Sequence, residues 1–81
     1  MDIVKGLVVR SAAGHDKGEF FVVMNIDNAY AYICDGKNRT MEKTKKKNLK
    51  HLFVTNTILH QECLETNRKI RRALREFSEK A

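Results

Sequence analysis

The length, composition and charge of the chain limit what it can be. Its 81 residues allow one small domain and leave little room for a deep catalytic cleft. The 16 Lys and Arg residues outnumber the 10 Asp and Glu residues, and the formal net charge of +6 favours an anionic partner such as nucleic acid or an acidic membrane.

Short strands account for the first two thirds of the predicted secondary structure. Turn residues separate the apolar runs, because Gly tolerates positive φ and Asp or Asn caps the local backbone. The apolar stretch from Glu19 to Ile26 is expected to cross the middle of the sheet, as part of a three-stranded meander. Five short strands around so small a core predict a mainly β protein with a closed or partly closed barrel. The predicted strands are residues 6–11, 18–26, 29–34, 39–42 and 49–54.

A helix is predicted at the end of the chain, from about Thr66 to Ser78, with Thr66 as its cap. The apolar residues Ile70, Ala73, Leu74 and Phe77 recur at helical spacing, so this stripe is expected to dock on the barrel. Residues 55–65 fit neither the helical nor the strand period, so two assignments stay open for them, an extra strand or an irregular crossing. We expect a single domain, monomeric when free, with the barrel in residues 1–64 and the docked helix in residues 65–81.

A membrane location and secretion are both disfavoured. The longest apolar run, Phe20 to Met24, is far shorter than the roughly 20 residues that span a bilayer. The start Met1-Asp2 carries an acid where a secretory leader has a basic segment. We therefore expect a cytoplasmic protein with no membrane partner.

A dense run of basic residues between positions 37 and 51 is the strongest functional signal. Glu42 is its only acid, so internal ion pairs are not expected to neutralise it. Lysines that neutralise phosphates release counterions and gain salt-dependent affinity, which predicts a loop that contacts nucleic acid. An ordinary solvated loop is the alternative, and in either case alanine at positions 45–47 should hardly affect folding. The candidate residues are Lys37, Arg39, Lys43, Lys45, Lys46, Lys47, Lys50 and His51.

The turn between the first two strands is a second candidate contact. Its paired glycines can expose backbone amides and let a phosphate or sugar edge come close. Any β-hairpin can carry such a turn, so its spacing alone decides little. The candidate residues are Arg10, Ser11, Gly14, His15, Asp16, Lys17 and Gly18.

The predicted helix carries a third candidate surface, opposite its apolar stripe. Four arginines there are either a secondary RNA contact or solvated side chains partly paired with Glu65, Glu76 and Glu79. They are Arg68, Arg71, Arg72 and Arg75.

Two tyrosines, Tyr30 and Tyr32, allow two interpretations. On an open sheet face they could stack on unpaired bases. In a small barrel aromatic residues are more often part of the core, and the core is the favoured assignment here.

Neither a metal site nor a catalytic site is predicted. His60 and Cys63 have the spacing of a ligand pair, but no second pair accompanies them, so we expect no metal and no cofactor. His15 and Asp16 lie in a turn without a nucleophile or second carboxylate beside them. In the cytoplasm Cys34 and Cys63 are expected to be buried or partly buried thiols.

In combination, three separated segments resemble one family. Residues 6–18 followed by 20–26 resemble the KOW motif of translation proteins. Residues 35–39 and 45–52 resemble the matching segments of bacterial KOW-domain RNA-binding proteins, which are similar to a group of large-subunit ribosomal proteins of archaea and eukaryotes. The resemblance covers residues 3–54, and the helix segment 70–74 is similar to the tail of the bacterial proteins. Thr44 stands where relatives commonly have proline before the lysine run.

The resemblance implies an SH3-like barrel, ribosomal RNA as the ligand and no enzymatic activity. We therefore expect an RNA-binding protein of the translation apparatus, either a ribosomal protein or a ribosome-associated one, with neighbouring ribosomal proteins as further partners in the ribonucleoprotein. The alternative is a basic SH3-like module that binds an acidic or extended peptide. Such modules need an aromatic-lined groove, and a chain with no Trp and only 2 Tyr is poorly supplied for one.

Overall fold

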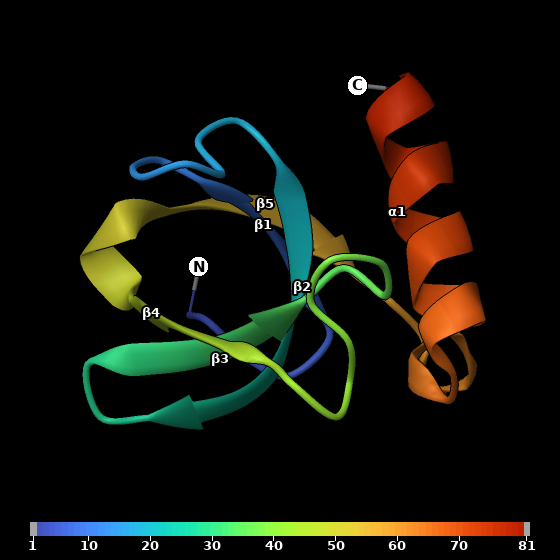
Figure 1. The fold of residues 1–81 in the computed structure, drawn as a ribbon, viewed down its shortest axis with the longest axis horizontal. Helices are drawn as coiled ribbons and strands as arrows, with labels where there is room; N and C mark the ends of the chain where they lie inside the picture. The colour runs from blue at the N-terminus through green and yellow to red at the C-terminus, as the bar shows by residue number, and fades with distance from the viewer. Residues whose placement is uncertain (1, 81) are drawn as a thin grey trace.

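The computed structural model describes residues 2–80, so the end residues of the two predicted segments, 1 and 81, lie outside it. Five antiparallel strands in the order β4-β3-β2-β1-β5 curl into a small SH3-like barrel, and one helix lies beside it (Figure 1). The 3-10 turn η1 (Leu49–His51) joins the two edge strands. The predicted fold class is therefore confirmed. The strands are β1 (Leu7–Ser11), β2 (Phe20–Asp27), β3 (Tyr30–Cys34), β4 (Lys45–Asn48) and β5 (Leu52–Ile58).

The fourth strand is not where the sequence predicted it. Residues 39–42 belong to a loop, and the lysine run itself supplies β4. In that loop the Asp35 carboxylate accepts the backbone N–H groups of Lys37 and Arg39, both at 2.9 Å. The N–H of Met41 is bound by the Asn67 side chain at 2.7 Å. These backbone donors are therefore satisfied by side chains, and pairing in the sheet would gain nothing for them.

The fifth strand begins later than predicted and takes in part of the undecided segment. The Asn48 side chain accepts the N–H of Lys50 at 3.1 Å, which favours the turn η1 over residues 49–51. β5 then runs from Leu52 to Ile58, and a second 3-10 turn, η2 (Gln61–Leu64), leads to the helix.

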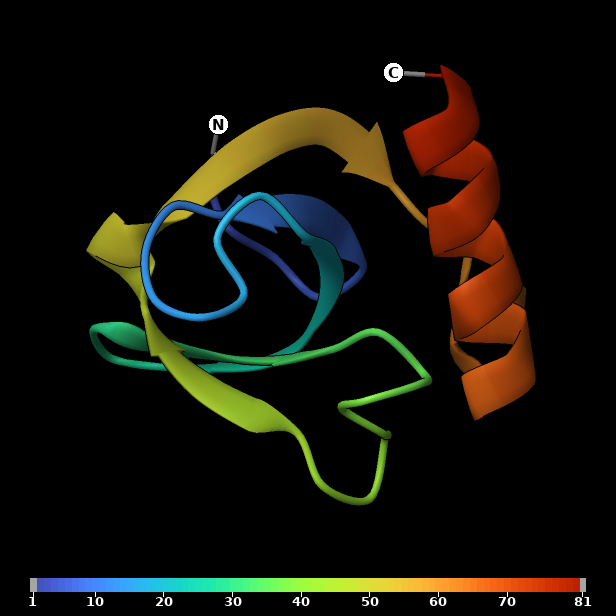
Figure 2. The same ribbon diagram turned by 45° about the horizontal axis from the view of Figure 1, so that its top comes forward.

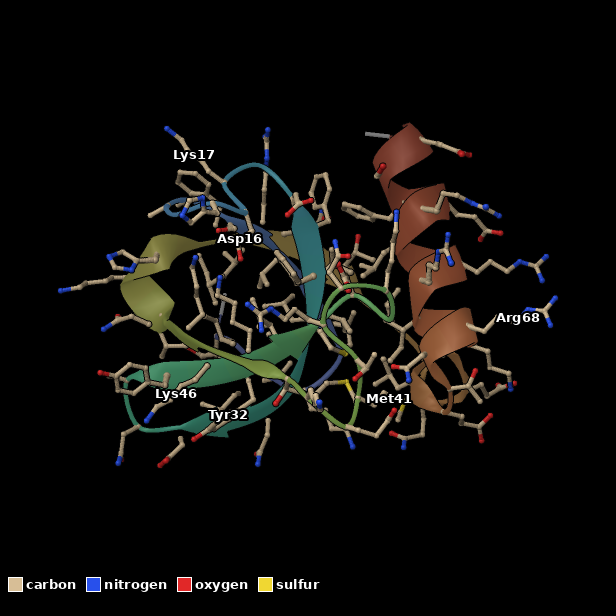
Figure 3. The ribbon with its side chains drawn as sticks, in the orientation of Figure 1. Asp16, Lys17, Tyr32, Met41, Lys46 and Arg68 are labelled. Carbon is tan, nitrogen blue, oxygen red and sulfur yellow. The ribbon has the colours of Figure 1, made fainter. Side chains whose placement is uncertain are left out.

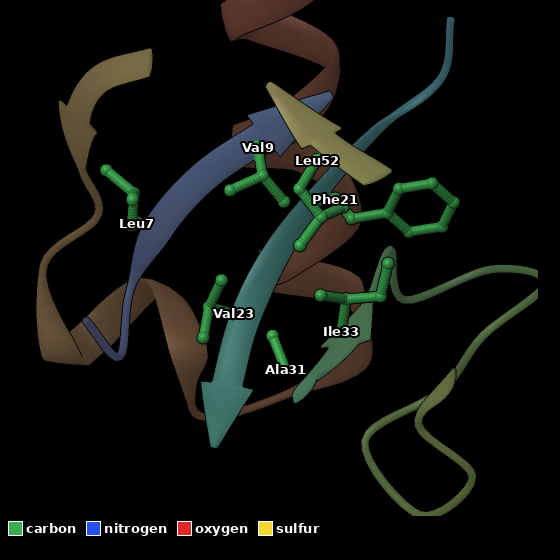
Figure 4. Packing of buried hydrophobic residues seen from close by; sticks show 7 residues of the cluster. All are labelled: Leu7, Val9, Phe21, Val23, Ala31, Ile33 and Leu52. Carbon is green, nitrogen blue, oxygen red and sulfur yellow. The ribbon is translucent and has the colours of Figure 1, made fainter. Parts of the chain in front are cut away.

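One core fills the inside of the barrel. Side chains alternate along each strand, so every second residue of β1, β2 and β3 points inward. Figure 4 shows six of these inward residues together with Leu52 of β5. They are Leu7, Val9, Phe21, Val23, Ala31, Ile33 and Leu52.

A second core lies between the outer face of the sheet and α1 (Asn67–Lys80), which Figure 2 shows against one side of the barrel only. Ile70 and Leu74 are buried, as predicted, while Ala73 and Phe77 are half-buried. The Phe77 ring packs edge-on against Phe20, with centroids 5.2 Å apart. The apolar residues of α1 meet Val8, Val22 and Cys34 on the outer face of the sheet. This contact explains why the start of β1 and the first half of β2 are apolar on both faces. Thr66 caps the helix as predicted, its hydroxyl accepting the N–H of Lys69 at 3.1 Å.

The two cysteines should differ in reactivity. Cys34 is buried in the second core, where burial, with Asp35 and Glu42 adding to it, raises the pKa of the thiol to about 11. Cys63 in η2 is only half-buried. We therefore expect iodoacetamide at mildly alkaline pH to modify Cys63 in the folded protein and both thiols after unfolding, because the thiolate is the nucleophile. Mass spectrometry of the native and denatured samples checks this, and labelling of both thiols in the native sample would contradict it.

Candidate nucleic-acid interface

A buried ionic cluster organises the first turn. The Asp16 side chain points into the barrel and is 11% exposed (Figure 3). Its Oδ1 accepts the Ser11 hydroxyl at 2.7 Å and Lys47 Nζ at 3.0 Å, and its Oδ2 accepts Lys45 Nζ at 2.8 Å. Burial acts to raise the pKa of Asp16, but the hydrogen bonds from Lys45, Ser11 and Lys47 outweigh it and hold that pKa well below its usual range. The Asp16 carboxylate is therefore ionised and has a structural role.

The three central lysines do not form the unpaired loop that the sequence predicted. They occupy β4, so their side chains alternate between the two faces of the sheet. Lys45 and Lys47 point inward to Asp16, and Lys47 is only 8% exposed and also donates to the Ala13 carbonyl at 2.7 Å. Lys46 points outward, with its Nζ 4.4 Å from the centre of the Tyr30 ring. Of the three, only Lys46 projects fully into solvent.

The amides of the first turn are partly used within it. The N–H groups of Lys17 and Gly18 donate to the Gly14 and Ser11 carbonyls at 3.2 and 2.8 Å. Arg10 is tied to the same turn, since its Nε donates to the Gly18 carbonyl at 3.2 Å. The turn is thus held in shape by its own hydrogen bonds, and the exposed side chains of His15 and Lys17 remain to meet a ligand.

The first turn and η1 share one end of the barrel. The N–H of Ala12 donates to the carbonyl of His51 at 2.8 Å, which joins the two segments directly. The two joined segments carry four exposed basic side chains, two lysines and two imidazoles. We call them the barrel-end patch, and they are His15, Lys17, Lys50 and His51. All four were candidates from the sequence, and the backbone hydrogen bond places the two segments that carry them next to each other.

The remaining bases of the run lie elsewhere. Lys37, Arg39 and Lys43 are exposed in the loop between β3 and β4. Arg39 lines a small groove of ≈ 170 Å³ beside His15. Lys37 lines a larger one of ≈ 430 Å³ with two helix arginines, and the acids Glu19 and Asp35 line it as well. The run is therefore spread over several surfaces.

Of the helix arginines, Arg68 points away from the barrel in Figure 3, whereas Arg71 and Arg75 also line the groove beside Lys37. Arg72 pairs with Glu76 at 3.5 Å, whereas Glu65 pairs with Lys69 at 2.9 Å. Within residues 2–80 the other three arginines form no ion pair. They line an open groove of ≈ 470 Å³ along α1, together with Arg72 and Glu76; the three are Arg68, Arg71 and Arg75.

The favoured core assignment of the two tyrosines is wrong. Tyr30 is 38% exposed, Tyr32 is half-buried, and neither belongs to either core. The signal was present in the alternation Tyr-Ala-Tyr-Ile, because the small and aliphatic residues between them, Ala31 and Ile33, fill the barrel.

Comparison with protein-family models finds no match to this chain, and comparison with the curated proteins finds none either. Across the described part of the chain, no helix has the length and apolar character needed to cross a membrane. Among residues 2–80, no three His, Cys, Asp or Glu side chains are grouped closely enough to hold a metal ion.

Proposed function

We propose that the protein binds structured RNA, with the barrel-end patch as its main contact. The observation that carries this proposal is the junction between the first turn and η1. The Ala12–His51 hydrogen bond joins the two segments, and the Lys47–Asp16 ion pair ties the first turn to β4, so the segments that carry Lys17 and Lys50 are held next to each other. Lysines carried on anchored segments meet converging phosphates with less loss of loop entropy than lysines on a flexible loop.

We further propose ribosomal RNA of the large subunit as the ligand and the cytoplasm as the location. The KOW-like segments support this assignment, and so does the chemistry of lysine, which reads charge and RNA shape rather than base identity. The protein then acts as a peripheral ribosomal or ribosome-associated protein. Sedimentation of a cell lysate tests this, since co-migration with large subunits should be lost at high salt.

We propose a binding role without catalysis. His15 and Asp16, the pair that could suggest acid–base chemistry, are divided between solvent and the barrel interior. Asp16 is committed to Ser11, Lys45 and Lys47. A carboxylate held in this way is poorly suited to take up a proton at neutral pH.

Removing the two lysines of the barrel-end patch should weaken RNA binding. For the double variant Lys17→Ala/Lys50→Ala we expect a loss of about 1–2 kcal/mol at moderate salt and a salt slope smaller by about two. Binding of a structured rRNA fragment, measured across a salt series, checks both values. Melting should be unchanged, because both side chains are exposed.

A matched control removes the same charge elsewhere. Lys5 precedes β1 and Lys69 lies on α1, and both are exposed. The variant Lys5→Ala/Lys69→Ala should lose much less affinity, since it retains the barrel-end patch. Equal losses in the two double variants would show that only net charge matters and would rule out this patch as the main contact.

A further inference from the structure

The outer face of β3 continues beyond the edge of the helix. Cys34, Tyr32 and Tyr30 alternate with inward residues and so share one face. Cys34 is covered by α1, whereas Tyr32 and Tyr30 extend past it into solvent. Figure 3 shows Tyr32 and Lys46 on a side of the barrel distant from both Arg68 and Lys17. This face therefore lies away from Lys17 of the barrel-end patch and from Arg68 of the helix.

Hydrogen-bonding side chains flank the two rings on both neighbouring strands. Tyr32 lies between Asn25 of β2 and Lys46 of β4, and Tyr30 lies between Asp27 and Asn48. The amide oxygens of Asn25 and Asn48 accept backbone N–H groups at 2.9 and 3.1 Å, which leaves their NH₂ groups to donate. The face thus combines two aromatic rings with donors, one carboxylate and one ammonium group.

We propose that Tyr30 and Tyr32 form a stacking platform for unpaired RNA bases, with Lys46 binding the adjoining phosphate. The proposal rests on the proposed RNA-binding function and adds the class of nucleotide recognised. Two residues apart on a strand, the tyrosines are separated by about 7 Å, against about 3.4 Å between stacked nucleotides of one strand. Each ring can therefore take its own base only from an opened strand, such as a bulge or loop.

The ammonium group of Lys46 already lies over Tyr30, 4.4 Å from the ring centre. The Tyr30 residue is otherwise exposed to solvent. A cation on an exposed ring is held weakly, so an incoming base can replace it. The freed ammonium group is then placed next to the phosphate of the stacked nucleotide. RNA is favoured over a peptide because the rings lie on an open sheet beside a cation in a chain of net charge +6.

The chain offers a direct readout of this platform. It contains no Trp and 2 Tyr, so all of its tyrosine emission comes from Tyr30 and Tyr32. We expect an RNA hairpin with an unpaired adenine bulge to quench this emission and to bind about tenfold more tightly than the same hairpin without the bulge. The fully paired hairpin should bind through phosphates elsewhere and leave the emission unchanged, after correction for its absorbance.

Variants separate stacking from folding. Tyr30→Leu/Tyr32→Leu should lose roughly tenfold in affinity for the bulged hairpin and keep the parent's affinity for the paired one. Tyr30→Phe/Tyr32→Phe retains both rings and should keep most of the preference for the bulge. Anisotropy of labelled RNA gives the affinities, and the emission of the parent protein remains a test even if the leucine variant folds poorly.

The failures are distinguishable. If the parent binds both hairpins equally and its emission does not change, the platform is wrong and the proposed function stands. If the parent binds neither hairpin, the proposed function fails and the platform fails with it. If the emission changes with protein concentration alone and the protein has the mass of a dimer, the face binds a second copy of the chain and the proposal is overturned. Quenching by an extended peptide but not by RNA would also overturn it.

Discussion

The variant Asp16→Ala should lower the free energy of unfolding by about 3–5 kcal/mol, because it leaves the buried ammonium group of Lys47 without a counterion. A loss of this size is a large part of the stability of a small domain. Urea denaturation followed by circular dichroism measures it. The variant Lys46→Ala is the matched control, since its side chain is exposed and loses only a cation–π contact worth about 0.5–1 kcal/mol. Similar losses in both variants would contradict the structural role of the cluster.

Acidification should lower the stability that the Asp16 cluster contributes to the fold. The folded-state pKa of Asp16 lies below its ordinary value of 3.8, so on acidification the unfolded chain takes up the proton first. The stability that the ionised carboxylate contributes is therefore complete above that value and is lost as the pH falls below it. Other carboxylates titrate in the same range, and the comparison of parent with Asp16→Asn isolates the contribution of this one.

The variant Gly36→Ala is expected to destabilise the protein by about 2–4 kcal/mol, through two effects that act together. Gly36 has φ +79°, a conformation that residues with a side chain rarely adopt. A Cβ atom there would overlap the carbonyl oxygen of Asn67 and lie 3.0 Å from the backbone nitrogen of Arg71. The loop between β3 and β4 would then have to move away from α1. Thermal melting measures the loss.

Gly14→Ala provides the comparison. Gly14 also has positive φ, at +89°, but the nearest atoms to its Cβ, Lys47 Nζ at 3.4 Å and an Asp16 oxygen at 3.6 Å, lie at ordinary contact distances. Only the backbone effect of about 1 kcal/mol is expected there. If the two alanine variants melted at the same temperature, the close approach of Gly36 to the helix would contribute nothing.

Much of the fold could be predicted from local pattern. The apolar runs Leu7 to Val9 and Phe20 to Met24 indicated strands, the second of them in the middle of the sheet, and both prove to be covered on two faces. The 3.6-residue period of Ile70 and Leu74 located the helix within two residues at each end. Periodicity is a local property, so elements that obey it are visible without knowledge of the tertiary structure.

The candidate site was less predictable, because its arrangement depends on contacts between distant residues. Lys45 and Lys47 look like their neighbour Lys46 in the sequence, and only the position of Asp16, 31 residues before Lys47, distinguishes them. The expectation that all three could be replaced without affecting folding is therefore wrong for the two that face Asp16. The same alternation places Tyr30 and Tyr32 outside the barrel.

The ion pair between Asp16 and Lys47 also restricts how this sequence can diverge. Loss of Asp16 alone leaves the ammonium group of Lys47 buried without a counterion, and loss of Lys47 alone leaves the buried carboxylate with only Lys45 and Ser11 as partners, whereas joint replacement by apolar residues of similar volume avoids the unpaired charge. The two positions therefore constrain each other and should change together in any lineage that shares this barrel. Position 46 precedes Lys47 in β4 but points to the opposite face, so it is free of that constraint and its residue can change as the ligand changes.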